Sequence, residues 1–243
     1  MAARKVASPG VKKRVKEPPP PPEETLFGPD EYASMRRVLL ASLDTFAELG
    51  YHGTATRDIA RRAQISAGGL YSHYDSKQAL LERIIHTTHE GMLQRMIAAR
   101  DEGGTARECL GRIVRTHVRF HAKYNTACRV ANYELHSLTP GYRKQIGVMR
   151  QAMESVVSEV LESGIDSGEF VVNDWALVTM FILSLGIDVS RWFRPGHRLT
   201  PEELSEQYED LVLAAISAPR AASAAGPSPS TTKPRSRRPS VKA

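Results

Sequence analysis

The chain has 243 residues, 41% of them hydrophobic and 25% charged, which is typical of an ordinary soluble protein. Its net charge of +6 comes from its ends, because residues 1–29 hold six basic and three acidic side chains and residues 219–243 hold six basic and no acidic ones. The N-terminus has charges but no apolar run, which argues against a secretory signal peptide. Two cysteines, Cys109 and Cys128, make no disulfide framework and favour a reduced, cytoplasmic protein.

The two ends of the chain differ in composition from the rest. Residues 1–28 are basic and then proline-rich, which predicts a disordered arm with a stiff polyproline segment. Residues 219–243 consist mainly of Ala, Ser, Pro, Lys and Arg and are predicted to be a disordered basic tail. Basic tails add non-specific attraction to a polyanion without sequence specificity. Two interpretations of the N-terminal arm remain: it follows a phosphate backbone, or it has no specific role.

Between these ends the apolar residues recur at helical spacing. No stretch alternates like a strand for more than four residues, so the predicted fold is all-α. The expected helices cover about 29–49, two short segments within 54–77, and then 77–100, 105–122, 124–137, 140–165, 173–194 and 201–217.

The stretch from Thr54 to Lys77 reads as two short helices joined by a tight turn. Thr54 or Thr56 is expected to cap the first helix, and Ser66 to cap the second. Two helices with a turn of three or four residues form the helix-turn-helix unit, whose second helix enters the DNA major groove.

Small residues open the second helix. Glycine costs roughly 1 kcal/mol in a helix interior, so two adjacent glycines indicate a close approach to DNA; a loosened connector is the alternative. Polar donors around them would fix the register on phosphates. The residues predicted to contact DNA are Thr54, Thr56, Arg57, Ser66, Ala67, Gly68, Gly69, Tyr71, His73 and Lys77.

The last two helices carry the most apolar surface. The run from Trp175 to Ile187 lies between two aspartates and, at thirteen residues, is too short to cross a bilayer, which predicts a buried helix. Paired with their copies in a second subunit, the two helices would form a four-helix interface; completing a monomer core is the alternative. The predicted dimer residues are Trp175, Phe181, Leu185, Trp192, Leu204, Tyr208, Leu211 and Ala215.

Residues 35–85 resemble the TetR family of bacterial transcriptional regulators. The likeness rests on Phe-Ala-Glu-Leu-Gly at 46–50, Thr-Arg-Asp-Ile-Ala at 56–60 within the first short helix, and Gly-Gly-Leu-Tyr-Ser-His-Tyr-Asp-Ser-Lys at 68–77. The resemblance implies a homodimer of all-helical subunits, with a DNA-binding domain at 29–76 and a ligand-binding and dimerisation domain at 77–218. It also implies that Tyr71, His73 and Lys77 touch phosphates.

A second resemblance lies at the end of the body. Residues 189–201 are similar to a branch of the same family that includes steroid-degradation repressors and senses acyl-CoA thioesters. That likeness implies that Arg191 pairs with a CoA phosphate. The chain departs from the steroid sensor at Leu183 and Ile187, where that sensor has a basic and an aromatic residue. The predicted ligand pocket comprises Met92, Met96, Phe120, Tyr133, Met153, Phe181 and Arg191, with ordinary core packing as the alternative for the methionines.

Other chemistry finds little support. His117 and His121 lie four residues apart, with His136 as a third candidate ligand, but no Cys or carboxylate follows at a matching spacing, so no metal is predicted. No phosphate loop, serine elbow or nucleophile–base pair is visible, so no enzyme activity or cofactor is expected. The predicted function is a repressor that leaves a double-stranded DNA operator when a small apolar or acyl-CoA ligand binds. An architectural DNA-binding protein dominated by its tails is the alternative.

Overall fold

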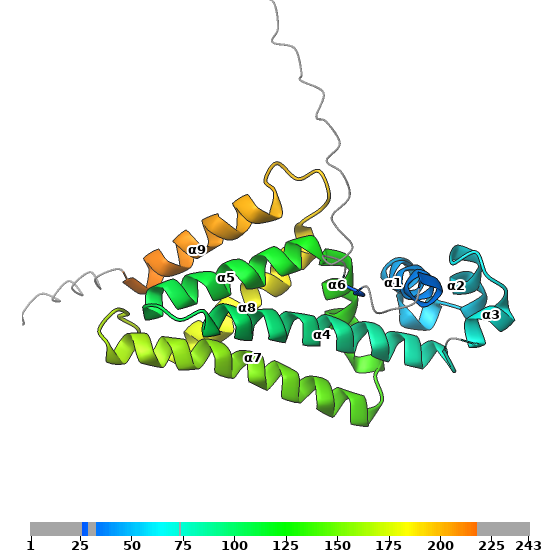
Figure 1. The fold of residues 1–243 in the computed structure, drawn as a ribbon, viewed down its shortest axis with the longest axis horizontal. Helices are drawn as coiled ribbons and strands as arrows, with labels where there is room; N and C mark the ends of the chain where they lie inside the picture. Colours follow the sequence, from blue (N-terminus) through cyan, green and yellow to red (C-terminus); the bar gives the residue numbers. More distant parts are fainter. Residues whose placement is uncertain (1–25, 29–32, 73, 218–243) are drawn as a thin grey trace, which may run out of the picture.

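The computed structural model describes residues 26–28, 33–72 and 74–217, and these contain helices and no strand. Two parts are visible in Figure 1: a small head of three helices at one end, and a larger body that α4 connects to the head. The elements are α1 (Ala33–Gly53), α2 (Thr56–Arg62), α3 (Ala67–Tyr71), α4 (Lys77–Asp101), α5 (Ala106–Lys123), α6 (Asn125–Tyr133), η2 (Leu135–Ser137), α7 (Pro140–Asp166), α8 (Trp175–Trp192) and α9 (Pro201–Ser217).

The hydrophobic core of the head continues into the body. Leu39 of α1, Ile59 of α2 and Leu70 of α3 are fully buried in it. The same cluster takes in Ala131 of α6 and Ile146 of α7, so the head packs against body helices as well as α4. Movement of α6 therefore reaches the head through its direct contacts with α1.

One residue of the predicted disordered arm belongs to this core. Phe27 is only 3% exposed and packs with the head, so the arm does not extend unbroken to residue 28 as expected. Its neighbour Leu26 is partly buried and packs against both the head cluster and the body cluster. Residues 1–25 and 218–243 lie outside the described residues, and with them most of the expectations for the two tails.

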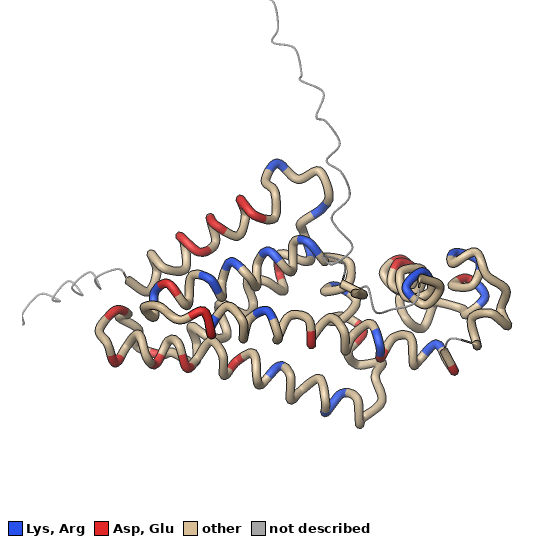
Figure 2. The backbone as a smooth tube through the Cα atoms, viewed as in Figure 1, with Lys and Arg blue, Asp and Glu red and all other residues tan. Residues whose placement is uncertain are grey.

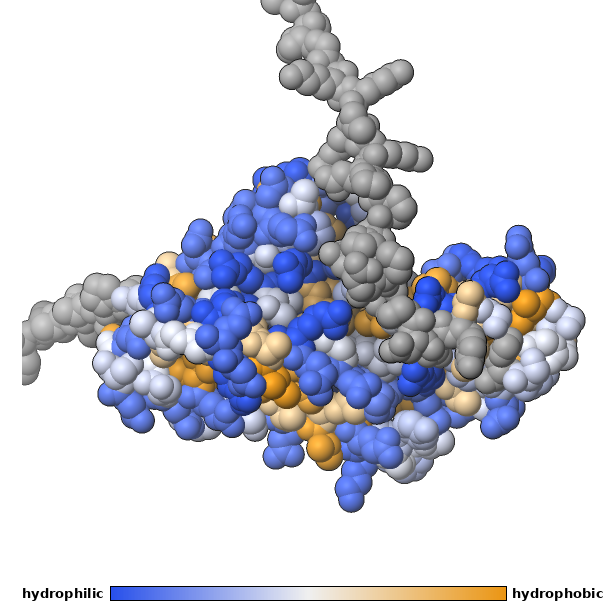
Figure 3. Space-filling model, in the orientation of Figure 1, coloured by the Kyte–Doolittle hydropathy of each residue, from blue (hydrophilic) through white to orange (hydrophobic). Residues whose placement is uncertain are grey.

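The body is arranged around α5, which packs against α4, α7, α8 and α9. Gly103 and Gly104 both adopt positive φ after α4, and this turn brings the chain back for α5. Acidic side chains follow α9 and basic ones follow α5 (Figure 2), and Arg115 pairs with Glu209 across them at 3.1 Å. The surface over these two helices is largely hydrophilic (Figure 3), so this side of the body faces water.

The turn after α2 contains a strained residue. Gln64 has φ +56°, a left-handed conformation that usually falls to glycine at the end of a helix. Two hydrogen bonds hold it there: Gln64 N donates to Arg61 O at 3.2 Å, and Ile65 N donates to Ala60 O at 3.0 Å. The hydrogen bonds and the burial of Ala60 outweigh the cost of the conformation.

Replacing Gln64 with glycine should therefore stabilise the fold. A non-glycine residue in this region costs roughly 1–2 kcal/mol, and the added freedom of glycine in the unfolded chain returns about half of that. We expect a gain of about 0.5–1 kcal/mol in urea denaturation. Gln151→Gly, in the exposed interior of α7, should instead lose about 1 kcal/mol. A loss at both positions would contradict this account of the turn.

The helix α8 (Trp175–Trp192) lies within the range 173–194 predicted for it. It has eighteen residues, and among the described residues it alone is long and apolar enough to cross a membrane by length and composition. It is also less buried than expected, since 28% of that stretch is buried. Much of its apolar surface is therefore left uncovered by the part of one chain that the structure describes.

Candidate DNA-binding surface and ligand cavity

The helix-turn-helix presents one exposed edge. Ser66 caps α3 as predicted, because its Oγ accepts a hydrogen bond from Gly69 N at 3.0 Å. Ser66, Ala67 and Gly68 are exposed, while Leu70 is fully buried and anchors α3 to the head. The small residues thus lie where backbone can approach another molecule closely.

Side chains of α2 lie beside this edge. Tyr71 is 51% exposed, and its hydroxyl lies 3.3 Å from Thr56 Oγ1 on α2. Arg57 is exposed and makes no hydrogen bond or ion pair with any residue that the structure describes. By contrast, Arg62 is held by Glu48 of α1 through two bonds of 2.7 Å. Thr56, Arg57 and Tyr71 therefore offer donors to a ligand, whereas Arg62 joins α2 to α1.

Two of the residues predicted to contact DNA have structural roles. Thr54 is 2% exposed, and its hydroxyl donates to Gly50 O at 2.7 Å, so burial removes it from any surface. Neither threonine caps α2, because Ala55 occupies that position without a side-chain cap. The Lys77 ammonium donates to Tyr51 O at 2.7 Å and to Thr54 O at 2.8 Å, so it ties α4 to the end of α1 and to the loop that follows. His73 lies outside the described residues.

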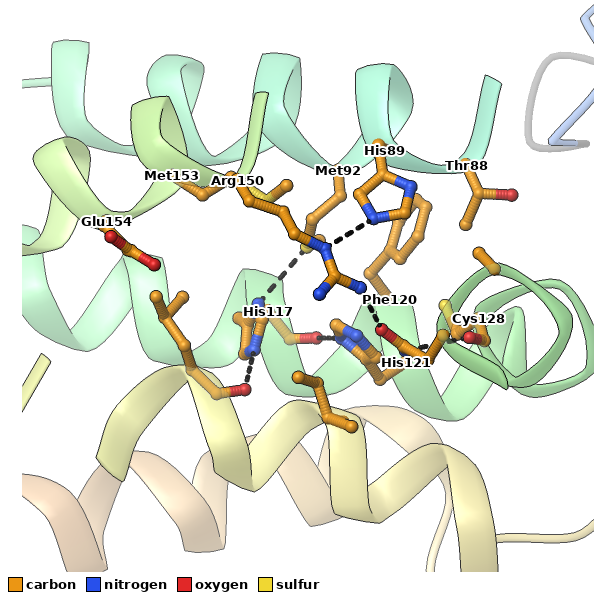
Figure 4. Close-up of a pocket in the computed structure, with 14 residues that line it drawn as sticks. Thr88, His89, Met92, His117, Phe120, His121, Cys128, Arg150, Met153 and Glu154 are labelled. Atoms are coloured by element: carbon orange, nitrogen blue, oxygen red, sulfur yellow. Dashed lines mark hydrogen bonds between the residues drawn. The ribbon is translucent and has the colours of Figure 1, made fainter. Parts of the chain in front are cut away.

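A cavity of about 130 Å³ opens between the helices of the body (Figure 4). Its wall is mainly apolar, with a few polar groups that point inward from α4, α5, α6 and α7. The lining residues are Thr88, His89, Met92, His117, Phe120, His121, Cys128, Ala131, Asn132, Arg150, Met153, Glu154, Leu183 and Ile187.

The histidines in this cavity are neutral near pH 7. Burial lowers the pKa of His89 and of His117 to about 4, and it lowers the pKa of His121 well below its usual value. His117 Nε2 donates to Leu183 O at 3.0 Å, and His121 Nδ1 donates to His117 O at 2.9 Å, since a carbonyl can only accept. These bonds fix the ring orientations without adding charge.

Arg150 brings a cation into the same space. It extends from α7 toward His89, His117 and His121 (Figure 4). Its Nε donates to His89 Nε2 at 3.2 Å and its Nη2 donates to Asn132 Oδ1 at 2.7 Å. His89 must therefore accept at Nε2 and donate from Nδ1, which lies 2.9 Å from Ile85 O.

Three of the seven residues predicted for the ligand pocket line this cavity. Met92, Phe120 and Met153 line the cavity. Four other predicted residues do not: Met96 is fully buried in the core, while Tyr133, Phe181 and Arg191 are exposed on the outside. Arg191 was expected near the centre of the body, but its side chain is 61% exposed and lies 3.5 Å from Asp188.

Arg150, Asn132 and the cavity histidines were not predicted as ligand contacts. The three histidines considered for a metal do not converge either, because His136 is exposed on η2. No group of three His, Cys, Asp or Glu side chains in the described part of the chain is placed to hold a metal ion.

A polar network connects the cavity wall to the head. Asn132 contacts Arg150 near the end of α6, and Glu134 follows two residues later. Glu134 Oε1 accepts a hydrogen bond from Tyr51 N of the head at 3.1 Å. Tyr51 Oη in turn donates to Gln78 Oε1 at 2.6 Å, on the first turn of α4. Both α4 and α6 therefore touch the cavity and the head.

The outer face of α8 is an apolar surface. Leu177 and Met180 are 66% and 65% exposed, and Phe181 is 49% exposed. Trp175, Trp192, Leu211 and Ala215 are also exposed, as a dimer interface requires. Leu204 is an exception among the residues predicted there, because it is 3% exposed and packs in the core of its own chain. Leu185 and Tyr208 are partly buried against that core.

An exposed helix-turn-helix joined to a helical body with an inner cavity defines a DNA-binding regulator with a separate ligand domain. Residues 38–84 match the family described as bacterial regulatory proteins, tetR family, and residues 103–216 match the tetracyclin repressor-like C-terminal domain. The chain belongs to the TetR family of bacterial regulatory proteins.

Relatives and solved structures agree with this assignment. A tetR-family regulatory protein from Rhodococcus RHA1 is 32% identical, covers 78% of this chain and all of its own, and superposes with a TM-score of 0.72. The transcriptional repressor KstR2 of Rhodococcus jostii is 27% identical over 72% of this chain and 86% of its own length. The structure of the ketosteroid transcriptional regulator KstR2 of Mycobacterium tuberculosis is 25% identical, with a TM-score of 0.73, and covers 78% of this chain and 97% of its own.

Proposed function

We propose that the protein is a dimeric repressor that binds a double-stranded DNA operator and leaves it when a small molecule occupies the body cavity. The exposed start of α3, with Ser66 to Gly68 at the surface and Tyr71 beside them, is the observation that carries this proposal. Two such helices in successive major grooves, about 34 Å apart, would read a roughly palindromic site.

The apolar face of α8 supports the dimer. A contiguous exposed apolar surface of this kind indicates a protein interface. A two-fold axis would bring the α8 and α9 faces of two chains together and bury Leu177, Met180 and Phe181. The positions of the two heads then depend on this interface, so binding to both half-sites requires it.

The connection between the cavity and the head supports release by a ligand. His89 and Lys77 lie on the same helix, α4, one at the cavity and one at the head. Asn132 and Glu134 make the corresponding contacts at the end of α6. A ligand that displaces Arg150 from Asn132 would favour a different position of α6 and hence of the head. The ligand lowers the affinity for DNA only to the extent that it binds the protein with the head in this different position more tightly than in the DNA-binding position.

Selection of bound fragments from sheared DNA of the source genome tests the proposal. We expect enrichment of palindromic sites, with an affinity that falls steeply as salt rises. A chain lacking residues 1–24 and 219–243 should keep its preference for those sites over a scrambled sequence. Loss of all DNA binding in that truncated chain would instead favour an architectural protein dominated by its tails.

Replacing Tyr71 with Ala should weaken operator binding without unfolding the protein. A hydrogen bond to a charged phosphate contributes about 1.5 kcal/mol, and a dimer carries two copies, so the affinity should fall roughly a hundredfold. Fluorescence anisotropy with a labelled operator measures the loss. Tyr71→Phe should lose nearly as much if the hydroxyl makes the contact. Tyr142→Ala on α7 is the matched control. An equal loss of operator affinity in that variant would contradict the assignment of Tyr71 to a phosphate contact.

A further inference from the structure

The cavity contains a cation that no carboxylate neutralises. The two hydrogen-bond acceptors of Arg150, His89 Nε2 and Asn132 Oδ1, are both neutral groups. Arg150 Nη1 has no hydrogen-bond partner among the described residues, and its two N–H groups remain available. Glu154 lies one helical turn further along α7 and acts on Arg150 through space, but it forms no ion pair with it.

Such an arrangement leaves a partly buried cation without an anionic partner. Burial lowers the pKa of Arg150 because water is withdrawn from the guanidinium, and a guanidinium nevertheless stays protonated in proteins. Neutral acceptors offset this loss of solvation less well than an anion does. The neighbouring histidines are neutral near pH 7, so Arg150 is the positive charge that an incoming anion meets among them.

The size of the cavity limits the ligand that fits. At about 130 Å³ it is slightly smaller than an engineered cavity of roughly 150 Å³ that holds benzene. One ring or a chain of about six carbons therefore fills it. Met92, Phe120 and Met153 supply an adaptable apolar wall for such a group.

We propose that the cavity binds a small organic anion, whose charged group pairs with Arg150 Nη1 while its short apolar part packs against Met92, Phe120 and Met153. The inference rests on the proposed function for the role of the cavity, and it names the chemical class of the effector. Carboxylates and the phosphates of an acyl-CoA share the chemistry that Arg150 recognises.

Calorimetry on the full chain without DNA tests this with three probes: hexanoate, its neutral isostere hexanamide, and hexanoyl-CoA. We expect hexanoate to bind about tenfold or more tightly than hexanamide, because a charge-assisted bond is much stronger than a neutral one. Arg150→Gln should reduce the affinity for hexanoate to that for hexanamide. Arg191→Gln is the matched control: its side chain is exposed, so the affinity for hexanoate should not change.

Glu154→Gln gives an independent readout that does not require Arg150 to be altered. Removing the like charge near the ligand should tighten hexanoate binding about two- to threefold and leave hexanamide unchanged. Thermal melting of each variant checks that it folds. Should Arg150→Gln fail to fold, the Glu154→Gln result and the hexanoate–hexanamide ratio of the wild type decide the question.

The outcomes distinguish a carboxylate from a CoA phosphate as the anion that pairs with Arg150. Binding of hexanoyl-CoA that depends on Arg150, without binding of hexanoate, assigns the charge to a CoA phosphate and overturns the inference, because the pantetheine arm places that phosphate far from the acyl chain and the two cannot share this cavity. Equal affinities for hexanoate and hexanamide, or no binding of either anion, overturn it. An absence of operator binding would overturn the proposed function and would leave these affinities unchanged.

Discussion

Met180→Asp should convert the protein into a folded monomer that no longer binds its operator. The side chain is 65% exposed in one chain, so the aspartate is hydrated there and the fold is kept. In the proposed dimer it would be an unpaired charge in an apolar interface, at a cost of roughly 3 kcal/mol or more. A two-fold interface contains it twice, and the dimer dissociation constant should rise at least about a thousandfold.

Sedimentation velocity at micromolar concentration measures this shift. Val148→Asp is the matched control, because Val148 is 60% exposed on α7 and Ile146 two residues before it packs with the head cluster. That variant should remain a dimer. A Met180→Asp protein that still sediments as a dimer and binds DNA would place the interface elsewhere.

Acidification should destabilise the folded protein between about pH 6.5 and pH 4. His89 and His117 have a folded pKa of about 4, below the value of 6.5 that an unfolded histidine has. The unfolded state therefore binds more protons throughout this window, and stability falls as pH falls. Two such histidines should remove about 3 kcal/mol of unfolding free energy between pH 6.5 and pH 5.

Urea denaturation at fixed protein concentration across this pH range measures the effect. His117→Gln should reduce the slope by about a third, because His89 and His121 still contribute, even though it also lowers stability at pH 7. His136→Gln is the control, since His136 is exposed and its replacement should leave the slope unchanged. Stability that stays constant from pH 6.5 to pH 5 would mean that these histidines are not buried as neutral groups.

The head was largely predictable because its signals are local. Ser66 caps α3 as expected, and the order and type of the helices follow from apolar spacing. Thr54 was misassigned and the backbone bonds of Lys77 were not anticipated, both for one physical reason: polar side chains near a turn can bond either DNA or the protein's own backbone. The backbone carbonyls that accept their hydrogen bonds belong to Gly50 and Tyr51 at the end of α1, and the local sequence pattern does not indicate these bonds.

The cavity was less predictable because it depends on packing between distant helices. Arg150 looks like an ordinary charged residue on a half-exposed helix, and only the approach of α4 and α6 turns it inward. Arg191 was chosen by resemblance, yet its helix turns it to the outside. Gly186 in α8 was one signal of this packing, because a side chain at Gly186 would collide with the rings of His117 and His121 on α5.

Operator affinity with and without a bound effector tests the central claim most directly. Anisotropy with the selected operator should be measured at increasing hexanoate, over the range in which calorimetry shows the cavity to fill. We expect the dissociation constant for DNA to rise about 5- to 150-fold, the usual size of such coupling, and Arg150→Gln to abolish the response. An operator affinity that stays constant while the cavity fills would contradict the account.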